Sequence, residues 1–360
     1  MVVGPRAAIA WRVQPSGKRR FLEGIPVIIG AQPLKVVLIV PVYDDWASLK
    51  QLLHAIDAQS GLNRVTLEAF VVNDGSLASP PPAVWYEYRF RNIRGIRLIN
   101  LICNLGHQRA IAVGLVMASG ETDSDGVVVM DCDGEDRPED IPKLIATALG
   151  NPDRIVCAQR SKRSESLTFR SFYFLYKTMF RLLAGSTINF GNFCYIPRSA
   201  LNRLGHSPSL WNHLAATLVR SRVPLVRVPT ERGHRYAGRS QMDFDALIAL
   251  GLSAISVYAD IVLVRIIIGT LVVSALTAAG LAVVAAIRLF TDLAIPGWAS
   301  TVFGSLSIVL MQSVIFAIVS AFLLLSSRSA KPIIPMIDAL DFVASTERFD
   351  MAQIEHARAS

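Results

Sequence analysis

The pattern of apolar and polar positions divides the chain into two parts. From Lys35 onward, short apolar runs typical of buried strands alternate with segments whose apolar residues recur at helical spacing. The predicted strands are the run that begins at Lys35, Leu67–Val72, Gly95–Ile99, Gly126–Met130 and Arg154–Ala158, and the predicted helices are Trp46–Gln59, His107–Ala118 and Glu139–Leu149. This alternation predicts an α/β domain in which a parallel sheet is covered by helices on both faces.

The pattern is less regular in the second half of this part. The segments GNFCYIPRSAL and PLVRVP predict a strand that turns into a helix and a further short strand. Residues Leu167–Leu183 interleave aromatic and basic side chains. This pattern is typical of an amphipathic core helix and also of a helix that lies on a membrane surface. Met242–Tyr258 predicts a mixed apolar helix, which either rests in the membrane interface or docks on the domain.

The remaining part contains two long stretches without charge, Ile266–Ile287 and Leu293–Ser327. A helix needs about 20 apolar residues to cross the hydrocarbon core, and neither stretch shows the polar stripe of a buried core helix. Arg265, Arg328 and Lys331 flank the same ends of the two predicted spans, whereas Arg288 lies at the other end. The excess of basic residues on cytoplasmic flanks predicts that both chain termini are cytosolic.

These patterns define the expected domain organisation. We expect a basic, poorly ordered N-terminal arm (1–34), an α/β domain (35–240), a juxtamembrane helix (241–260), two transmembrane helices (261–288 and 299–327) and a cytosolic tail (328–360). The protein is therefore expected to be an integral, multi-pass protein of the inner or plasma membrane, in contact with the lipid bilayer.

Charge and cysteine content restrict the candidate functions. The net charge is +8, and many basic residues lie between Arg154 and Arg239, shortly before the spans. Because no nucleic-acid-binding motif accompanies them, lipid headgroups and phosphates are favoured as partners over nucleic acid. The four cysteines are scattered without a Cys-x-x-Cys pair, which argues against a zinc or redox site.

The segment VVVMDCDGEDRPED, residues 127–140, carries the strongest chemical signal. Four apolar residues deliver Asp131 and Asp133 to the end of a strand, where two carboxylates can bind Mg²⁺ or Mn²⁺ together with waters and substrate phosphates. Glu135, Asp136 and Glu139 are further candidates. The alternative is a solvated acidic turn that leads into a helix.

Polar side chains also follow the other predicted strands. They are Tyr43, Asp44 and Asp45 after the first strand, Asp74 after the second and Asn104 after the third. Ligands of parallel α/β sheets bind beyond the carboxyl ends of the strands, so we expect these residues to converge on one edge with the acidic loop.

In this order the motifs resemble those of the polyprenyl-phosphate glycosyltransferases of family 2, which have the GT-A fold, a Rossmann-like nucleotide-sugar-binding domain. The similar segments are IVPVYDD, VVNDGS, NLGHQRAIAVG, DCDGEDRPED, GNFCYIPRSAL and RGHRYAGRSQM. The chain departs from the family pattern at Asn73, which replaces an Asp, and at Gly134, Glu135, Arg137 and Gln241, which stand where Leu, Gln, Pro and Lys are usual.

The resemblance implies a nucleotide-sugar donor and a set of residues that bind it. Pro41, Tyr43 and Asp45 would frame the nucleoside, although Asp45 is equally suited to cap the following helix. Asp74 would face the base. The implied donor-binding residues further include Asn104, Asp131, Cys132 and Asp133, and the implied metal ligands are Asp131, Asp133 and Glu135.

The resemblance also implies a polyprenyl-phosphate acceptor, undecaprenyl or dolichyl phosphate, and an inverting transfer of one sugar at the cytosolic face. The phosphate oxygen is already ionised, so catalysis depends on positioning and on cations that hold two phosphates together. Asp133 and Asp136 at the metal, with Arg160, Arg170, Arg235 and Ser240, are the residues expected to do this. His107, His213 and His234 are interpreted as structural, because no catalytic spacing includes them.

Two other functions remain open at this stage. One is a processive polysaccharide synthase of the same superfamily, although no Gln-x-x-Arg-Trp segment follows the acidic loop. The other is a non-catalytic membrane adaptor that keeps the nucleotide-binding fold. Homo-oligomerisation is also left open, as are the sugar and the base.

Overall fold

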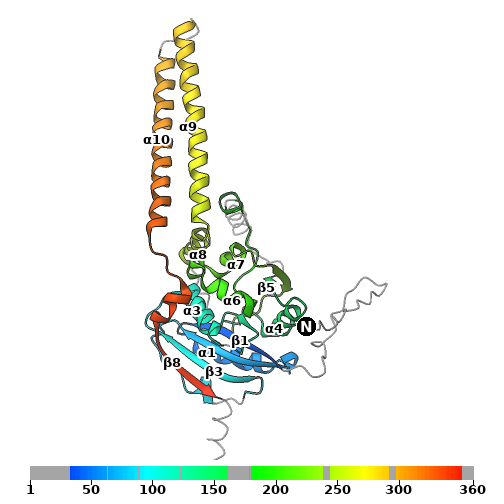
Figure 1. Ribbon diagram of the computed structural model, residues 1–360. Coiled ribbons are helices and arrows are strands. Elements are labelled where there is room, and N and C mark those ends of the chain that lie inside the picture. The colour runs from blue at the N-terminus through cyan, green and yellow to red at the C-terminus, as the bar shows by residue number, and fades with distance from the viewer. Residues whose placement is uncertain are drawn as a thin grey trace, which may run out of the picture.

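The computed structural model describes residues 33–350, except 63, 87–89, 122, 161–177, 179, 186, 238–243 and 292–296. It consists of an α/β domain from which a long helical hairpin projects (Figure 1). The expected N-terminal arm lies almost entirely outside the described residues, and so do Arg170 and Ser240.

The described part of the domain is built on one sheet of eight strands in the order β7-β5-β6-β4-β1-β2-β3-β8. The strands are β1 Leu34–Val42, β2 Val65–Asn73, β3 Ile93–Leu101, β4 Gly126–Val129, β5 Ile155–Arg160, β6 Cys194–Pro197, β7 Leu225–Thr230 and β8 Val343–Asp350. The seven strands expected from the apolar runs are all present. The eighth, β8, comes from the segment that was expected to be a tail.

The sheet is mixed, and the parallel arrangement expected from the alternation holds for its central strands. Strands β4, β1, β2 and β3 are parallel, but β6 runs antiparallel to β4 and β5, and β8 runs antiparallel to β3. In both exceptions the chain approaches from the carboxyl edge of the parallel strands: Cys194 at the start of β6 pairs with Val129, and Val343 at the start of β8 pairs with Leu101. A strand that enters from that edge can only run back toward the opposite one.

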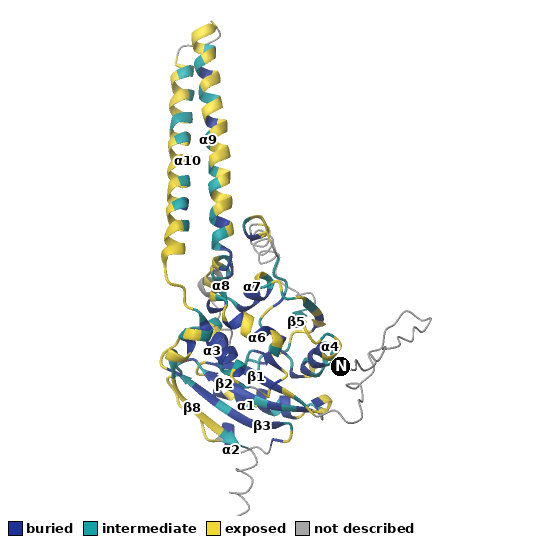
Figure 2. Cartoon of the chain, viewed as in Figure 1, coloured by how far each residue is buried: buried dark blue, intermediate teal, exposed yellow. Residues whose placement is uncertain are grey.

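Alternate residues of the central strands face two different hydrophobic cores. Val36, Leu38 and Val40 pack with α1 (Trp46–Asp57) and α4 (Ile141–Leu149), whereas Val37 and Ile39 pack with helices on the other face. Those helices are α3 (His107–Ser119), α6 (Arg198–Gly205) and α7 (Leu214–Arg220). Burial on both faces explains why these strands read as continuous apolar runs, and Figure 2 shows them as the most buried part of the chain.

Short elements complete the domain. They are the four-residue helices α2 (Ala83–Tyr86) and α11 (Pro335–Asp338) and the 3₁₀ turns Ser60–Leu62, Pro138–Asp140, Pro208–Trp211 and Ala339–Phe342.

The hairpin consists of α9 (Ala259–Phe290) and α10 (Trp298–Ser329), each of 32 residues. Their most apolar windows have mean hydropathies of 2.4 and 2.6, and only 11% of each window is buried. Helices of this length reach about 48 Å, which exceeds the ~30 Å hydrocarbon core of a bilayer. Their exposure (Figure 2) argues against core helices and matches the expected pair of membrane spans.

Helix α8 (Phe244–Ser256) connects the domain to the hairpin by docking on α7. Ala254 and Val257 are buried against Ala216, and Arg220 pairs with Asp260 at 2.9 Å. The end of this segment thus contacts the domain, and its placement in the membrane interface stays a prediction.

The chain returns to the domain after the hairpin. The Met336 side chain of α11 contacts Ser119 at the end of α3, and β8 then pairs with β3 along its length. The hairpin is thus inserted between two parts of one folded unit, and its two ends lie on the same side of it (Figure 1).

Candidate active site

The carboxyl ends of β4, β1, β2 and β3 lie next to one another in the sheet. The loops that follow them carry Asp131, Tyr43, Asp74 and Asn104. The expectation that these strand ends share one edge is confirmed, because the four strands are parallel neighbours.

Asp136 is the most buried carboxylate of the acidic loop, with 4% of its side chain exposed. It accepts hydrogen bonds from the backbone N–H of Asp131 (3.2 Å) and from the Arg160 guanidinium (2.9 Å). Burial and the nearby Asp131 charge together raise the pKa of Asp136 to about 7, against the opposing effect of Arg160. Asp136 therefore ties the start of the loop to Arg160 at the end of β5.

Asp131 faces His107, the first residue of α3. His107 Nε2 lies 3.0 Å from Asp131 Oδ1 and 3.1 Å from Asn192 Nδ2. Burial alone would raise the pKa of Asp131, but the charge and hydrogen bond of His107, together with Arg160 and Asn192, outweigh it and the pKa lies below its usual value. Conversely, burial would lower the pKa of His107, and Asp131 raises it overall. The sequence carries no spacing signal for this pair, which is why His107 was interpreted as structural.

Asp133 and Glu135 differ in their surroundings. The Asp133 carboxylate accepts a hydrogen bond from the Glu135 backbone (2.9 Å) and pairs with Arg235 (2.7 Å). Burial raises the pKa of Asp133, and the neighbouring carboxylates of Asp131 and Glu135 add to this increase. A carboxylate whose negative charge is disfavoured in this way is suited to a nearby cation.

Glu135 is surrounded by three guanidinium groups. Its Oε1 contacts Arg232 (2.5 Å) and Arg235 (3.3 Å), and its Oε2 contacts Arg160 (3.2 Å). Despite the opposing effect of burial, these arginines lower the pKa of Glu135, so it is ionised at neutral pH. Sequence reasoning did not single out Arg232, although it is the first residue of the family-like segment RGHRYAGRSQM.

Arg232 and Arg235 reach Glu135 because the loop after β7 crosses the acidic loop, whereas Arg160 reaches it from the end of β5. Backbone N–H groups of Gly233 and Tyr236 donate to the carbonyl oxygens of Glu135 (2.9 Å) and Asp133 (3.0 Å). Gly134 lies beneath this crossing with φ +87°, and a Cβ atom there would lie 2.8 Å from the His234 carbonyl oxygen. A leucine, which the family usually has here, would not fit this arrangement.

The described residues contain no group of three His, Cys, Asp or Glu side chains that could hold a metal ion. Mg²⁺ commonly binds through one or two carboxylates and completes its shell with waters and substrate phosphates. Asp131 and Asp133, two residues apart directly after β4, provide two carboxylates of this kind. Both oxygens of Glu135 contact arginines, and its role as the third metal ligand stays a prediction.

Asp74 is buried and binds the backbone. Its two oxygens accept hydrogen bonds from the N–H groups of Leu105 (2.8 Å) and Gly106 (3.0 Å), which fixes the loop before α3. Burial raises the pKa of Asp74 in spite of these bonds.

The other predicted nucleoside-binding residues surround the end of β1. Tyr43 is 43% exposed, and Asp45 caps α1 by accepting a hydrogen bond from the Ser48 N–H at 3.3 Å. The capping role of Asp45, which the sequence left open, is thus present. Pro41 is buried in β1, Cys132 is half-buried, and Asn104 is exposed.

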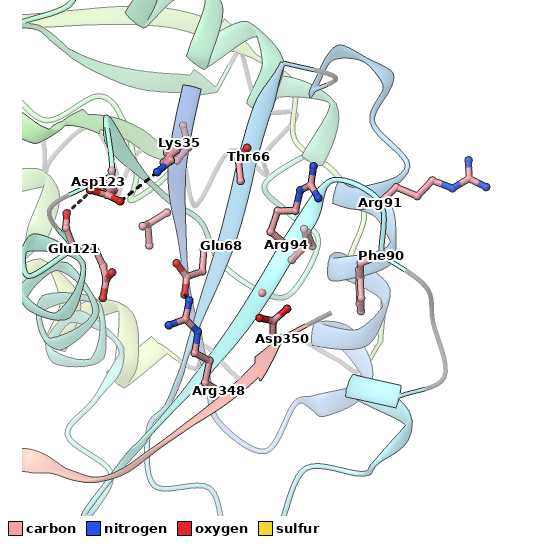
Figure 3. A pocket seen from close by; sticks show the side chains of 15 residues that line it. Lys35, Thr66, Glu68, Phe90, Arg91, Arg94, Glu121, Asp123, Arg348 and Asp350 are labelled. Atoms are coloured by element: carbon pink, nitrogen blue, oxygen red, sulfur yellow. Dashed lines mark hydrogen bonds and ion pairs between the residues drawn. The ribbon is translucent and has the colours of Figure 1, made fainter. Parts of the chain in front are cut away.

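A separate cavity of about 430 Å³ opens at the opposite edge of the sheet, near the amino ends of β1, β2 and β3. Figure 3 shows its mixed charges, including the pair Lys35–Asp123 at 3.3 Å and Arg348 near Glu68 at 3.7 Å. It contains none of the predicted site residues.

Over 134 residues the chain is 34% identical to the undecaprenyl-phosphate 4-deoxy-4-formamido-L-arabinose transferase of Proteus mirabilis (strain HI4320), a match that covers 37% of this chain and 39% of that protein. It is 25% identical over 272 residues to the uncharacterised glycosyltransferase YkcC of Bacillus subtilis (strain 168), covering 74% and 81% of the two chains.

Among solved structures, the chain is similar to glucosyl-3-phosphoglycerate synthase from Mycobacterium tuberculosis, which was crystallised in complex with Mn²⁺, UDP-glucose and phosphoglyceric acid. The TM-score is 0.44 and the sequence identity is 17%, and the match covers 64% of this chain and 80% of that one. Residues 37–205, which include the sheet edge and the acidic loop, match the model of glycosyl transferase family 2. The chain therefore carries a glycosyltransferase domain of family 2.

Proposed function

We propose that the protein is an inverting glycosyltransferase that moves one sugar from a nucleotide-diphosphate sugar to a polyprenyl phosphate at the cytosolic face of a membrane. The observation that carries the proposal is the acidic loop at the sheet edge, which is crossed by the arginine-rich loop after β7. The same domain bears two apolar helices. The name of the Proteus relative, an undecaprenyl-phosphate transferase, supports the class of acceptor.

The donor side of the reaction would use Asp131 and Asp133. A bound Mg²⁺ or Mn²⁺ would neutralise the charge that develops on the leaving nucleoside diphosphate. His107 holds the Asp131 carboxylate from one side, and the Asp136 carboxylate binds the Asp131 backbone from the other. The chain itself thus orients the first aspartate of the loop.

The acceptor side would use the arginines. The acceptor phosphate oxygen forms the new bond to the anomeric carbon as the bond from that carbon to the leaving diphosphate breaks, and attack on the opposite face inverts the configuration. No proton has to be removed from an ionised phosphate, so the main requirement is in-line positioning. Arg160 and Arg235 each face two carboxylates, and their planar donor groups match phosphate oxygens as well.

Asp136 would act on the acceptor through Arg160. Its buried carboxylate is bound to Arg160 Nη2, so it sets the direction of that guanidinium. Arg170 and Ser240, also expected to contact the acceptor phosphate, lie outside the described residues.

The hairpin provides a reason for membrane attachment. A polyprenyl phosphate stays in the bilayer, so an anchored domain meets it at a high effective concentration. Both ends of the hairpin join the same folded domain, as they must if the domain lies on one side of the membrane.

A donor panel tests the proposal directly. Membranes containing the full chain would be incubated with radiolabelled nucleotide sugars, Mg²⁺ or Mn²⁺, and undecaprenyl or dolichyl phosphate. We expect chloroform-extractable label with one donor and no label for the Asp133→Asn variant. The absence of lipid-linked label across the whole panel would contradict the proposal, and nucleotide binding without transfer would favour the adaptor.

A further inference from the structure

Three polar side chains form a ladder across β2, β3 and β8 at the edge of the sheet that carries the acidic loop. In the strand register Asn73 pairs with Asn100, and Asn100 pairs with Ser345. The strands β2 and β3 belong to the family domain, whereas β8 follows the apolar hairpin in the chain. The ladder therefore connects the last described strand to the turn at the end of β2.

The ladder is held by directed hydrogen bonds. Asn73 Nδ2 donates to Asn100 Oδ1 (2.9 Å). Asn100 Nδ2 in turn donates to Ser345 Oγ (3.0 Å) and to Glu347 Oε1 (3.1 Å). Because an ionised carboxylate only accepts hydrogen bonds, Glu347 requires the NH₂ group of Asn100 to face β8, and this leaves the Asn100 oxygen for Asn73.

The ladder continues into the loops predicted to bind the nucleoside. Asn73 Oδ1 accepts a hydrogen bond from the Ser76 N–H (3.0 Å), which closes the NDGS turn. Ser76 Oγ accepts one from the Asp44 N–H (2.9 Å). Asp44 has φ +49°, a conformation that non-glycine residues seldom adopt without support from their surroundings.

The ladder gives a physical reason for Asn73, where the family usually has Asp. A carboxylate at this position would still accept from Ser76 but would have no proton for Asn100 Oδ1. Asn100 would then have to turn its NH₂ group toward residue 73 and its oxygen toward the Glu347 carboxylate, which places two acceptors against each other. Asn73 and Glu347 are thus matched through Asn100.

We propose that β8 belongs to the donor site, with Glu347 and Asn100 acting as positioning residues that set, through Asn73, the loops that receive a nucleoside diphosphate. This inference rests on the proposed function, because it takes the loops at residues 43–45 and 73–76 as the nucleoside site. It adds that the chain beyond the hairpin determines how well these loops are formed. None of the ladder residues has to touch the reacting atoms.

A double-mutant cycle between Asn73 and Glu347 tests the proposal. The full chain in detergent would be titrated calorimetrically with UDP, GDP, CDP, ADP and dTDP in the presence of Mn²⁺, and KM and kcat would be measured with the donor that supports transfer. We expect Asn73→Asp to weaken nucleoside diphosphate binding and raise the donor KM by about fivefold or more, the equivalent of one hydrogen bond, with little change in kcat. Glu347→Gln should restore binding in the Asn73→Asp background, since its amide can donate to the turned Asn100.

Control variants separate the ladder from general damage to β8. Arg348→Ala changes the next residue of the strand, which lies near Glu68 and outside the ladder, and should leave the donor KM unchanged. Thermal unfolding would show that each variant is folded. If one of these variants fails to fold, Asn100→Ser is measured in its place. The shorter serine side chain cannot bond to Asn73 on β2 and to Glu347 on β8 at once, so the donor KM should rise here too.

The outcomes distinguish this inference from the proposed function. A wild-type protein that binds none of the nucleoside diphosphates would overturn both. Two results would overturn the ladder alone, provided that the wild type binds a nucleoside diphosphate. In the first, Asn73→Asp binds it equally well; in the second, the effects of Asn73→Asp and Glu347→Gln are strictly additive. Rescue of the donor KM by Glu347→Gln would support it.

Discussion

The guanidinium of Arg235 lies 2.7 Å from the carboxylate of Asp133, a residue 102 positions earlier in the chain. This contact joins the loop after β7 to the acidic loop after β4. A divalent cation bound at Asp133 would carry the same sign of charge as the Arg235 guanidinium and would compete with it for the same carboxylate. Donor binding would therefore shift Arg235 toward incoming phosphates, which are the groups it is proposed to hold.

The Asp133→Asn variant tests the assignment of the metal. We expect transfer to fall by at least about a hundredfold, because the neutral amide cannot offset the charge of the cation. The protein should remain folded and in the membrane fraction. Asp153→Asn, at an exposed position away from the loop, is the control and should retain activity. Full activity of Asp133→Asn in a lipid-extraction assay would remove Asp133 from the metal site.

Glu135→Gln distinguishes a metal ligand from a partner of the arginines. Because both oxygens of Glu135 contact guanidinium groups, we expect the variant to bind Mn²⁺ as tightly as the wild type. We expect the KM for the polyprenyl phosphate to rise severalfold as Arg160, Arg232 and Arg235 lose their common anchor. Electron paramagnetic resonance of Mn²⁺ measures the first quantity, and a weakened Mn²⁺ affinity would show that Glu135 is a ligand after all.

Asp136 should make stability depend on pH in a defined direction. Its folded-state pKa of about 7 is above the ordinary value of 3.8, so the folded protein holds a proton that the unfolded chain releases. The contribution of this group therefore stabilises the fold below pH ~4 and is lost as pH rises toward 7. The thermal midpoints of the wild type and of Asp136→Asn would be measured without metal between about pH 4 and pH 7. The difference between the two midpoints should change with pH across this range. A difference that stays constant would contradict the raised pKa of Asp136.

Arg160→Lys tests the link between Asp136 and the acceptor. Lysine keeps the charge but cannot bind Asp136 and Glu135 at once with a rigid, planar group. We expect kcat to fall by about tenfold or more, with the donor KM little changed. A variant with normal kcat would show that Arg160 is a structural cation only.

The hairpin predicts a simple topology. With exposed Cys103 replaced by serine, a cysteine introduced at Ser300, beside the turn between the helices, should react with a membrane-impermeant maleimide in intact cells. A cysteine at Ser345 in β8 should react only after the membrane is broken. Labelling in the reverse order would place the domain outside the cell.

Much of the domain could be predicted from local sequence. Strands β1 and β4 are buried on both faces and so appear as apolar runs, and the acidic loop is contiguous in the chain. The two apolar helices were also evident from composition. These features depend on the periodicity or the spacing of neighbouring residues, which a single sequence contains.

The pairing of β8 could not be predicted in the same way. Most of its residues are exposed, so it lacks the apolar alternation that indicates a strand. Its place in the sheet comes from backbone hydrogen bonds to β3, which most residue types can form, and from contacts between residues far apart in the chain, such as Asn100 with Glu347. The segment after the hairpin was consequently expected to be a tail.

The sequence by itself determined the alternating elements, the carboxylates of the acidic loop, the resemblance to family 2 and the two apolar helices. Only the tertiary structure decided which cations meet those carboxylates: His107 at Asp131, and Arg232 with Arg160 and Arg235 at Glu135. The physical reason is that ion pairs act over a few ångströms between residues far apart in the chain, and the folding of the loops across one another brings them within that range.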